Sequence, residues 1–479
     1  MKKRFAVILT ILCMLLTTVP VFAEETPVKS DDIVILHTND VHTYIDGELS
    51  YDVIAAIKVQ LEEQYENVIL ADAGDHIQGT AYGSMDKGKT IIELMNAAKY
   101  DIATLGNHEF DYGMTGCKNA VAWADFQYTS CNFYWEQDGE RMGNVHPGYV
   151  DFECGDRTVR FIGITTPETF TKSTPAYFQD EEGNYIYGIS GGADGAALYK
   201  DVQNVLDRVE GDDTTVIALG HLGDDPASKP WTSEETIANT TGLDAFIDGH
   251  SHSKVLGKEV KDKDGNSVVL SQTGEYFGGI GVMIIDDETG KITTDYITVE
   301  EVTEGEGDAE QVVGYKVVSD IYNYEGAELP SVASVKEIKD AWMKSVDEQL
   351  GVKIGSTDVT FDNYDAEGNR LVRKQETNTG NFAADALYYL FDNMDMDVDL
   401  AIMNGGGVRN KAITGEISYL TCKNIHTFGN VACLQEVTGQ QILDALEWGA
   451  RDAGTAECGG FLHVSGITYK IDTTITNTV

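Results

Sequence analysis

The sequence predicts an α/β protein whose first part is built on a parallel sheet. Between residues 33 and 105, apolar runs of strand length alternate with segments that carry apolar residues at helical spacing. This alternation is typical of parallel strands joined by right-handed helical crossovers. Several of the strands also end directly in His, Asp or Asn, and the carboxyl ends of such strands are where α/β sheets form their sites.

Short runs rich in aliphatic and β-branched residues predict the strands of this first part. They lie at 33–36, 68–70, 102–105, 161–164, 215–219, 245–247, 268–270 and 282–285. Helices are expected at 51–65, where an apolar stripe ends at Tyr65, and at 89–99. Residues 300–314 are acidic, contain Gly and show no periodicity, which indicates a loop.

The later part of the chain predicts a second, α+β domain. A helix with one apolar stripe, at 334–350, is expected to connect the two domains. After it, residues 376–381 lead into a helix, and a strand at 400–403 ends in a Gly-rich turn. The predicted organisation is a first domain at 31–305, an acidic linker with the connecting helix at 306–350, and a second domain at 351–479.

The amino terminus resembles an export signal. A basic start, Met1-Lys2-Lys3-Arg4, is followed by an apolar run and by Val21-Phe22-Ala23, a plausible cleavage site. The apolar run is too short to favour a membrane span, and no other stretch is apolar enough to cross a bilayer. We therefore predict a signal peptide at 1–23 and a secreted protein in the periplasm or at the cell surface.

Charge and cysteine content exclude several functions. The formal net charge is −45, and removal of the three basic residues of the signal would leave −48. Such a surface repels nucleic-acid polymers and anionic membranes, so an anionic substrate needs local positive charge. Six Cys would remain after cleavage, and none has the C-x-x-C spacing of a cysteine metal site. Export permits disulfides, but the sequence does not give their pairing or the oligomeric state.

Seven polar residues at strand ends are candidate metal ligands. They are Asp40, His42, Asp75, Asn107, His221, His250 and His252. Carboxylate, imidazole and amide without thiolate suit Zn, Mn, Fe or Co rather than a structural zinc site. Each could instead be an ordinary turn or hydrogen-bonded residue, but all of them follow strands of one predicted sheet. Seven ligands exceed the need of one tetrahedral ion, which indicates two ions roughly 3.5–4 Å apart.

The motifs resemble the calcineurin-like metallophosphoesterases and, more narrowly, the secreted 5′-nucleotidase family with its UDP-sugar hydrolase and 2′,3′-cyclic-nucleotide phosphodiesterase relatives. They are His37-Thr38-Asn39-Asp40-x-His42, Asp72-x-Gly74-Asp75, Gly106-Asn107-His108-Glu109-x-Asp111, Gly249-His250-Ser251-His252 and Asn404-Gly405-Gly406-Gly407-x-Arg409. The resemblance implies a four-layer α-β-β-α sandwich and a second domain that binds substrate. Thr43 stands where relatives usually have Gly, so a small local change is expected there.

The resemblance also implies how the ligands divide. One ion would lie on Asp40, His42, Asp75 and His252, and the other on Asp75, Asn107, His221 and His250. The expected cofactors are two divalent ions (Zn, Mn or Co) that create an attacking hydroxide between them. His108 would stabilise the transition state or protonate the leaving oxygen, and Asp111 would hold its imidazole. The alternative is a core histidine capped by Asp111.

The second domain is expected to hold the nucleotide. By resemblance, Arg373 and Arg409 contact the phosphate, Asn404 the sugar, and Phe428 and Asn430 the base. Phe428 could instead belong to the core, and Arg373 could be a surface charge. Relatives continue beyond Val479, so the second domain is expected to be truncated.

The predicted function is a secreted phosphohydrolase that releases phosphate from nucleoside 5′-monophosphates and related nucleotides. Alternatives are a 2′,3′-cyclic-nucleotide phosphodiesterase or a nucleotide-sugar hydrolase on the same metal site, and a non-catalytic nucleotide-binding protein. The sequence does not decide the metal or the preferred base.

Overall fold

The computed structural model describes residues 29–209, 213–305, 311–324, 326, 328–410, 412–428 and 430–475. The predicted signal peptide lies outside these ranges. Within the described part of the chain, no helix combines the length and the apolar character that crossing a bilayer requires.

The first domain contains two large sheets. One has the strand order β16 (Gln311–Val318), β15 (Ile292–Glu304), β14 (Ile280–Ile285), β1 (Ser30–Thr38), β2 (Tyr65–Asp72), β3 (Ile102–Thr104) and β4 (Gln127–Thr129). The other has the order β12 (Lys254–Lys261), β13 (Ser267–Thr273), β11 (Ala245–Ile247), β10 (Thr214–Gly220), β8 (Arg157–Ile164) and β7 (Tyr149–Cys154). Strands β1 to β4 are parallel, and so are β8, β10, β11 and β13.

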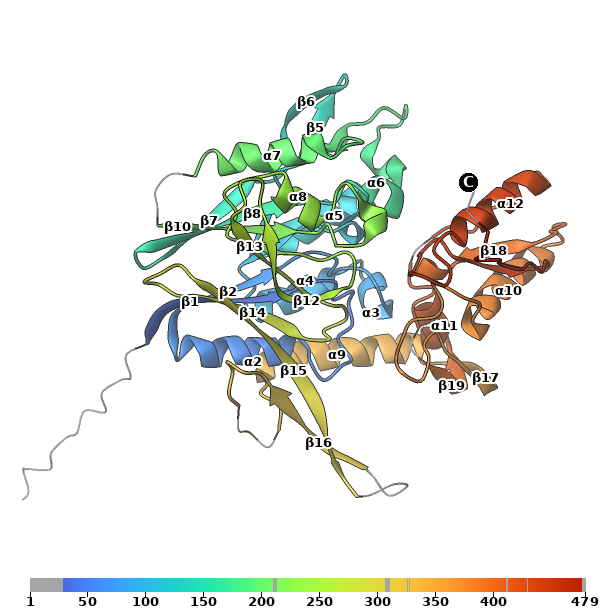
Figure 1. Ribbon diagram of the computed structural model, residues 1–479. Coiled ribbons are helices and arrows are strands. Elements are labelled where there is room, and N and C mark those ends of the chain that lie inside the picture. Colours follow the sequence, from blue (N-terminus) through green and yellow to red (C-terminus); the bar gives the residue numbers. More distant parts are fainter. Residues whose placement is uncertain are drawn as a thin grey trace, which may run out of the picture.

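The two sheets pack face to face between helices, which confirms the four-layer sandwich. Aliphatic residues from both sheets, among them Ile35, Ile69, Ile217 and Ile247, form one buried cluster between them. Figure 1 shows helix α7 above the sheets and helices α2 and α9 below them. The covering helices are α2 (Tyr51–Glu62), α4 (Lys89–Ala97), α5 (Gly113–Trp123) and α9 (Ala333–Leu350) on the first sheet, and α7 (Ala196–Leu206) and α8 (Ser233–Ala238) on the second.

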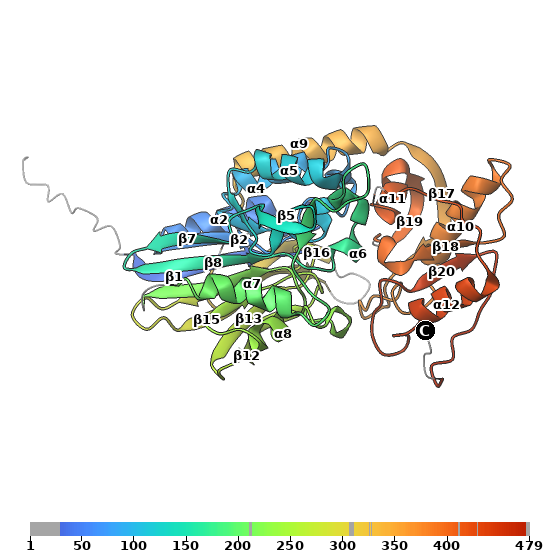
Figure 2. The ribbon, with the colours of Figure 1, turned by 90° about the horizontal axis from the view of Figure 1, so that it is seen from above.

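Short elements complete the first domain. They are a small sheet of β6 (Glu140–Asn144), β5 (Phe133–Gln137) and β9 (Tyr187–Ile189), the helices α3 (Ala81–Ser84) and α6 (Thr169–Lys172), and the 3-10 turns η1 (His108–Phe110), η2 (Pro175–Phe178) and η3 (Pro226–Ser228). Helix α9 then runs along the first domain toward the second (Figure 2).

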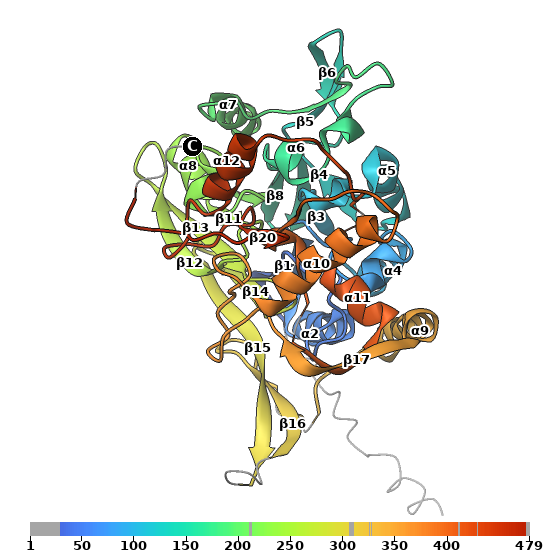
Figure 3. The same cartoon turned by 90° about the vertical axis from the view of Figure 1, so that its right-hand side faces the viewer.

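The second domain is smaller and more open. It pairs β17 (Lys353–Phe361) with β19 (Ile413–Ser418) and β18 (Ala401–Asn404) with β20 (Leu462–Ser465), beside α10 (Asn378–Asp392), η5 (Gly405–Gly407), α11 (Tyr419–Ile425) and α12 (Gly439–Gly449). Figure 3 shows these elements in front of the first domain. Among the described residues its buried apolar cluster consists of Val372, Ala383, Val408 and Ile425.

Three sequence-based expectations were wrong. The candidate ligands follow strands of two sheets, because period-two patterns mark strands without showing which sheet they join. Tyr65 begins strand β2 and is not the end of a helix. Residues 300–304 and 311–314, expected as loop, belong to the β15–β16 hairpin. Beyond Glu300 this hairpin is largely exposed on both faces, so its sequence lacks the alternation that a buried face imposes.

Candidate metal centre and catalytic dyad

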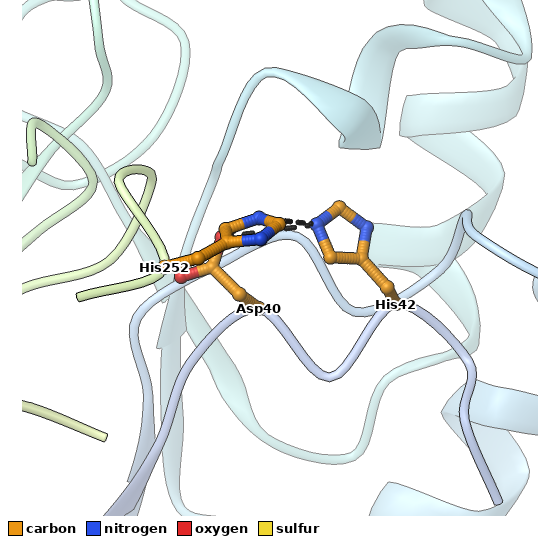
Figure 4. Close-up of side chains that lie close together, drawn as sticks. All are labelled: Asp40, His42 and His252. Carbon is orange, nitrogen blue, oxygen red and sulfur yellow. Dashed lines mark hydrogen bonds and ion pairs between the residues drawn. The ribbon is translucent and has the colours of Figure 1, made fainter. Parts of the chain in front are cut away.

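The loops at the carboxyl ends of both sheets bring the candidate ligands together. The first sheet supplies Asp40 and His42 after β1, Asp75 after β2 and Asn107 after β3; the second supplies His221 after β10, and His250 and His252 after β11. Figure 4 shows Asp40, His42 and His252 facing one another. Their ligand atoms lie within 4.8 Å of one another, and the same holds for Asp75, His221 and His250.

Most of these ligands adopt a backbone conformation that is rare outside glycine. The φ angles are 48° for Asp40, 47° for His42, 61° for Asp75, 79° for His250 and 60° for His252. Positive φ in non-glycine residues concentrates at functional sites, where the surrounding structure enforces it. Thr43, at the position where Gly was expected, also has a positive φ of 61°, and its hydroxyl accepts a hydrogen bond from the Thr80 amide at 2.8 Å.

Asp75 occupies the centre of the cluster. Its Oδ2 lies 3.0 Å from His221 Nε2, 3.7 Å from His42 Nε2 and 4.0 Å from His108 Nε2. Asp40 Oδ1 lies 3.4 Å from His252 Nε2 and 3.8 Å from the Nε2 atoms of His42 and His221. Asp75 therefore faces both groups of candidate ligands.

The hydrogen bonds of the Nδ1 atoms set the tautomers of His42 and His252. His42 Nδ1 donates to the Gln78 carbonyl at 2.8 Å, and His252 Nδ1 donates to the Glu275 carboxylate. The Nε2 atoms of these two rings then carry lone pairs, and they face each other at 3.1 Å. Two lone pairs repel at this distance unless a cation lies between them. The residues present thus fit a divalent ion at this position.

The two buried carboxylates differ in their electrostatics. Burial raises the pKa of Asp40 to about 7, although the His221 imidazole opposes the rise. Burial acts in the same sense on Asp75, but the imidazoles of His221, His108 and His42 hold the pKa of Asp75 well below its usual range. A buried, anionic Asp75 surrounded by imidazoles is a strong ligand for a cation.

A histidine–aspartate pair lies beside the ligands. His108 Nδ1 donates to Asp111 Oδ2 at 2.6 Å, and the His108 amide donates to Asp75 Oδ1 at 2.8 Å. Burial disfavours a charged imidazole, but the carboxylates of Asp111 and Asp75 outweigh it and raise the pKa of His108. The Nε2 atom of His108 faces the metal side, so the imidazole can deliver a proton there.

Glu109 fixes the loops that carry this pair, a role that the sequence did not indicate. Its buried carboxylate accepts from the amides of Asp75 at 2.8 Å, His76 at 2.9 Å and Gly106 at 2.7 Å. Gly106 is required at its position, because a Cβ there would lie 2.2 Å from Asp75 Oδ1. The loops after β2 and β3 are thereby locked to each other.

Sequence reasoning missed several further residues at the site. Glu168, after β8, accepts from His250 Nε2 at 2.8 Å, while His250 Nδ1 lies 2.9 Å from Asn107 Oδ1. Glu275 and Tyr276 follow β13, and Tyr276 packs near the rings of His42 and His252. All three follow strand ends, as the candidate ligands do, but the sequence does not distinguish them from other residues in these loops.

Of the predicted substrate residues, Arg409 and Phe428 contact the first domain. Arg409 Nη1 donates to the Tyr276 hydroxyl at 3.1 Å, and the Phe428 ring lies 5.3 Å from the His108 ring. Asn404 donates to the Gly459 carbonyl at 3.1 Å, and Asn430 is exposed. The structure therefore brings Arg409 and Phe428 to the first-domain site. Asn404 bonds within its own domain, and Asn430 lies exposed.

Arg373 differs from its neighbour Arg370 in its partners. Arg370 pairs with Glu457 at 2.7 Å and with Glu275 at 3.2 Å. Burial, together with Arg370 and Arg409, lowers the pKa of Arg373 to about 9. Among the described residues, the Arg373 guanidinium has neither a hydrogen bond nor an ion pair. This is the local positive charge that a protein of net charge −45 needs for an anionic substrate.

Comparison with known proteins identifies the two parts of the chain. Residues 33–254 match the calcineurin-like phosphoesterase family, and residues 353–478 match the 5′-nucleotidase C-terminal domain. The chain is 28% identical to protein UshA of Escherichia coli over 87% of this chain and 76% of that protein. It is 26% identical to human 5′-nucleotidase, over 92% of this chain and 75% of the human protein.

Two further matches show the extent of the similarity. The trifunctional nucleotide phosphoesterase YfkN of Bacillus subtilis is 26% identical over 91% of this chain, which spans only 29% of that protein. The solved structure of a 5′-nucleotidase precursor from Thermus thermophilus has the same fold, with a TM-score of 0.71, 23% identity, and coverage of 93% of this chain and 83% of that one. Together with the site geometry, these matches show that the chain belongs to the 5′-nucleotidase family of phosphoester hydrolases, in which a calcineurin-like phosphoesterase domain precedes a 5′-nucleotidase C-terminal domain.

Proposed function

We propose that the protein hydrolyses nucleoside 5′-monophosphates and related nucleotides with two divalent metal ions, Zn, Mn or Co. The observation that carries this proposal is the convergence of Asp40, His42, His221, His250 and His252 on a central Asp75, beside the His108–Asp111 pair. Bound there, the two ions would supply an acidic water as nucleophile and neutralise the phosphoryl oxygens.

The ligands divide between the two positions as follows. Asp40, His42, Asp75 and His252 would hold one ion, and Asp75, Asn107, His221 and His250 the other. The ligand groups on either side of Asp75 and the facing Nε2 atoms of His42 and His252 support this division.

His108 is the proton donor in this proposal. The carboxylates of Asp111 and Asp75 favour the protonated imidazole and raise the pKa of His108, and Asp111 fixes the ring by accepting from Nδ1. The Nε2 proton can then stabilise the transition state or pass to the leaving oxygen of the ester.

The two domains divide the work. The first domain, which includes strand β16 and is covered by helix α9, carries the hydrolytic chemistry, and residues 351–479 hold the nucleotide. Arg373 and Arg409 would bind the phosphate, Phe428 would stack on the base, and Asn404 and Asn430 would bond the sugar and base. Among the described residues the Arg373 guanidinium has no hydrogen-bond or ion-pair partner, and Asn430 is exposed, which leaves both groups available to a ligand.

We place this activity outside the cytoplasm. The export signal predicted at 1–23 and the acidic surface of the chain support a secreted, periplasmic or surface location. Expression of the full chain followed by fractionation tests this location, and retention of the uncleaved protein in the cytoplasm would contradict it.

A substrate panel tests the activity. Purified protein is expected to release phosphate from AMP in the presence of Mn, Zn or Co and to lose this activity on chelation. ADP, UDP-glucose, 2′,3′-cyclic AMP and an aryl phosphate complete the panel, because cyclic and sugar nucleotides are the alternative substrates. Hydrolysis of the aryl phosphate and of no nucleotide would show that nucleotides are not the substrates. Nucleotide binding without turnover under any metal would favour a non-catalytic binding protein.

A further inference from the structure

We infer that one short segment, Glu168–Ser173, positions both halves of the active site at once. Glu168 holds the metal ligand His250, and Ser173 holds Asp111 of the proton-donating pair. The segment contains the single-turn helix α6 and follows strand β8 of the second sheet. The inference rests on the proposed function and assigns two positioning residues to it.

Glu168 controls which nitrogen of His250 is available. Its Oε2 accepts from His250 Nε2 at 2.8 Å and from the Ser228 hydroxyl at 2.6 Å, in a position where Glu168 is only 9% exposed. A carboxylate that accepts a hydrogen bond from Nε2–H keeps the proton on Nε2, so that Nδ1 carries a free lone pair. That lone pair lies 2.9 Å from Asn107 Oδ1, another acceptor, so the two atoms form a place for a cation.

Ser173 controls the orientation of Asp111. Its hydroxyl donates to Asp111 Oδ1 at 2.8 Å, while Asp111 Oδ2 accepts from His108 Nδ1 at 2.6 Å. With one donor on each oxygen, the plane of the carboxylate is fixed, and the imidazole of His108 is fixed with it. The hydroxyl contacts neither a ligand nor the imidazole, so Ser173 acts through Asp111.

The segment between these two side chains is held tightly. Thr169 Oγ1 donates to the Thr166 carbonyl at 2.6 Å, and the Lys172 and Ser173 amides donate to the carbonyls of Glu168 at 2.8 Å and Thr169 at 2.9 Å. The Phe170 ring packs on Phe178 with centroids 4.8 Å apart. Because one turn joins them, the metal side and the proton-donating side are set at a fixed separation by the same element.

Metal titration tests the Glu168 half without any substrate. In the chelated full chain, Glu168→Ala is expected to weaken one of the two Co²⁺ or Mn²⁺ sites by about 10- to 100-fold and to leave the other unchanged. Glu168→Gln keeps an acceptor oxygen and is expected to lose less. Glu181→Ala, an exposed acid on the same stretch of chain, is the matched control. Wild-type affinity at both sites in Glu168→Ala would overturn the inference.

Turnover of an aryl phosphate tests the Ser173 half. Ser173→Ala is expected to lower kcat about fivefold with KM and metal content unchanged, as for the loss of one hydrogen bond to a carboxylate. Ser173→Thr restores the hydroxyl and should restore kcat, and Thr174→Ala, which alters the exposed neighbour, should have no effect. Unchanged kcat in Ser173→Ala, or a loss of kcat that Ser173→Thr fails to restore, would overturn this half.

The two halves separate the inference from the proposed function. A wild-type protein that hydrolyses no phosphoester would end the proposed function and the Ser173 half together. The metal titration of Glu168→Ala would still decide the Glu168 half, because it needs no turnover.

Discussion

The candidate metal side and the proposed nucleotide side of the site are built in different ways. Asp40, His42, Asp75 and His221 are at most 2% exposed, and each is held by neighbours in the loops behind it. Across the interface, Arg409 and Phe428 are half-buried and Asn430 is exposed. The first domain also has extended buried clusters on both faces of its first sheet, whereas four residues form the described cluster of the second domain.

Under the proposed function, hydrolysis lies on the rigid, buried side of the site and nucleotide recognition on the more exposed side. Positive φ angles, buried hydrogen bonds and the Glu109 carboxylate pre-form the ligand geometry, so the metal side depends little on the second domain. The proposed nucleotide side depends on domain placement, because Arg370 and Arg409 meet the first domain at Glu275, Tyr276 and Tyr44. Substitutions should therefore separate into losses of turnover and losses of substrate affinity.

The largest expected effect is on turnover. His108→Ala removes the proton donor and should lower kcat by roughly 10²- to 10⁴-fold on every substrate of the panel. The metal content should stay the same, because His108 belongs to neither proposed ligand set. Steady-state kinetics together with metal analysis measure both quantities. His146→Ala, at a half-buried histidine of the first domain, is the control and should keep its turnover. Near-normal kcat in His108→Ala would remove this residue from the mechanism.

An intermediate effect is expected on affinity. Phe428→Ala removes the surface proposed to stack on the base, and such stacking contributes roughly 1–3 kcal/mol. KM for AMP should rise by about one to two orders of magnitude, whereas kcat/KM for an aryl phosphate should change little. Tyr389→Ala, at an exposed aromatic residue of α10, is the matched control. Equal losses on AMP and the aryl phosphate would show that Phe428 serves the chemistry and not the base.

The candidate ligands of the metal side could be predicted from the sequence because they follow the ends of strands. Strand ends place residues such as Asp75 and His221 at a defined edge, and local patterns of apolar residues locate those strands. What the pattern does not show is which sheet a strand joins, since packing of the two sheets is a long-range property. The convergence of residues on one site was therefore predictable, but its position between two sheets was not.

The acidic composition of the chain makes the supporting carboxylates difficult to identify from the sequence. Glu109, Glu168 and Glu275 are three of 79 acidic residues in this chain, and a loop carboxylate that holds an imidazole resembles a solvated one in sequence. Their partners are distant along the chain: Glu168 meets His250, and Arg370 meets Glu275, only in the folded protein. In the second domain the sparse core leaves few periodic runs, so the roles of Asn404 and Asn430 remain predictions from resemblance.

The smallest expected effect concerns the stability of the layer beneath the metal ligands. His76 Nδ1 donates to Asp72 Oδ1 at 2.8 Å, and its Nε2 lies 2.7 Å from the Tyr128 hydroxyl. Burial alone would lower the pKa of His76, but Glu109 and Asp72 outweigh it and raise the pKa to about 9. The native state then binds more protons than the unfolded state between the ordinary histidine pKa of 6.5 and about 9.

The sign of the pH dependence follows from this proton count. The stabilisation from His76 is complete below pH 6.5 and is lost as the pH rises toward 9, at roughly 1.4 kcal/mol per pH unit. In urea unfolding of the metal-free protein between pH 7 and 9, the free energy of unfolding should fall more steeply in the wild type than in His76→Gln. His463 of the second domain provides the contrast, because burial lowers its pKa and folding therefore does not increase its proton binding over this range. His463→Gln should therefore leave the slope unchanged, and parallel wild-type and His76→Gln curves would show that His76 is neutral in the native protein.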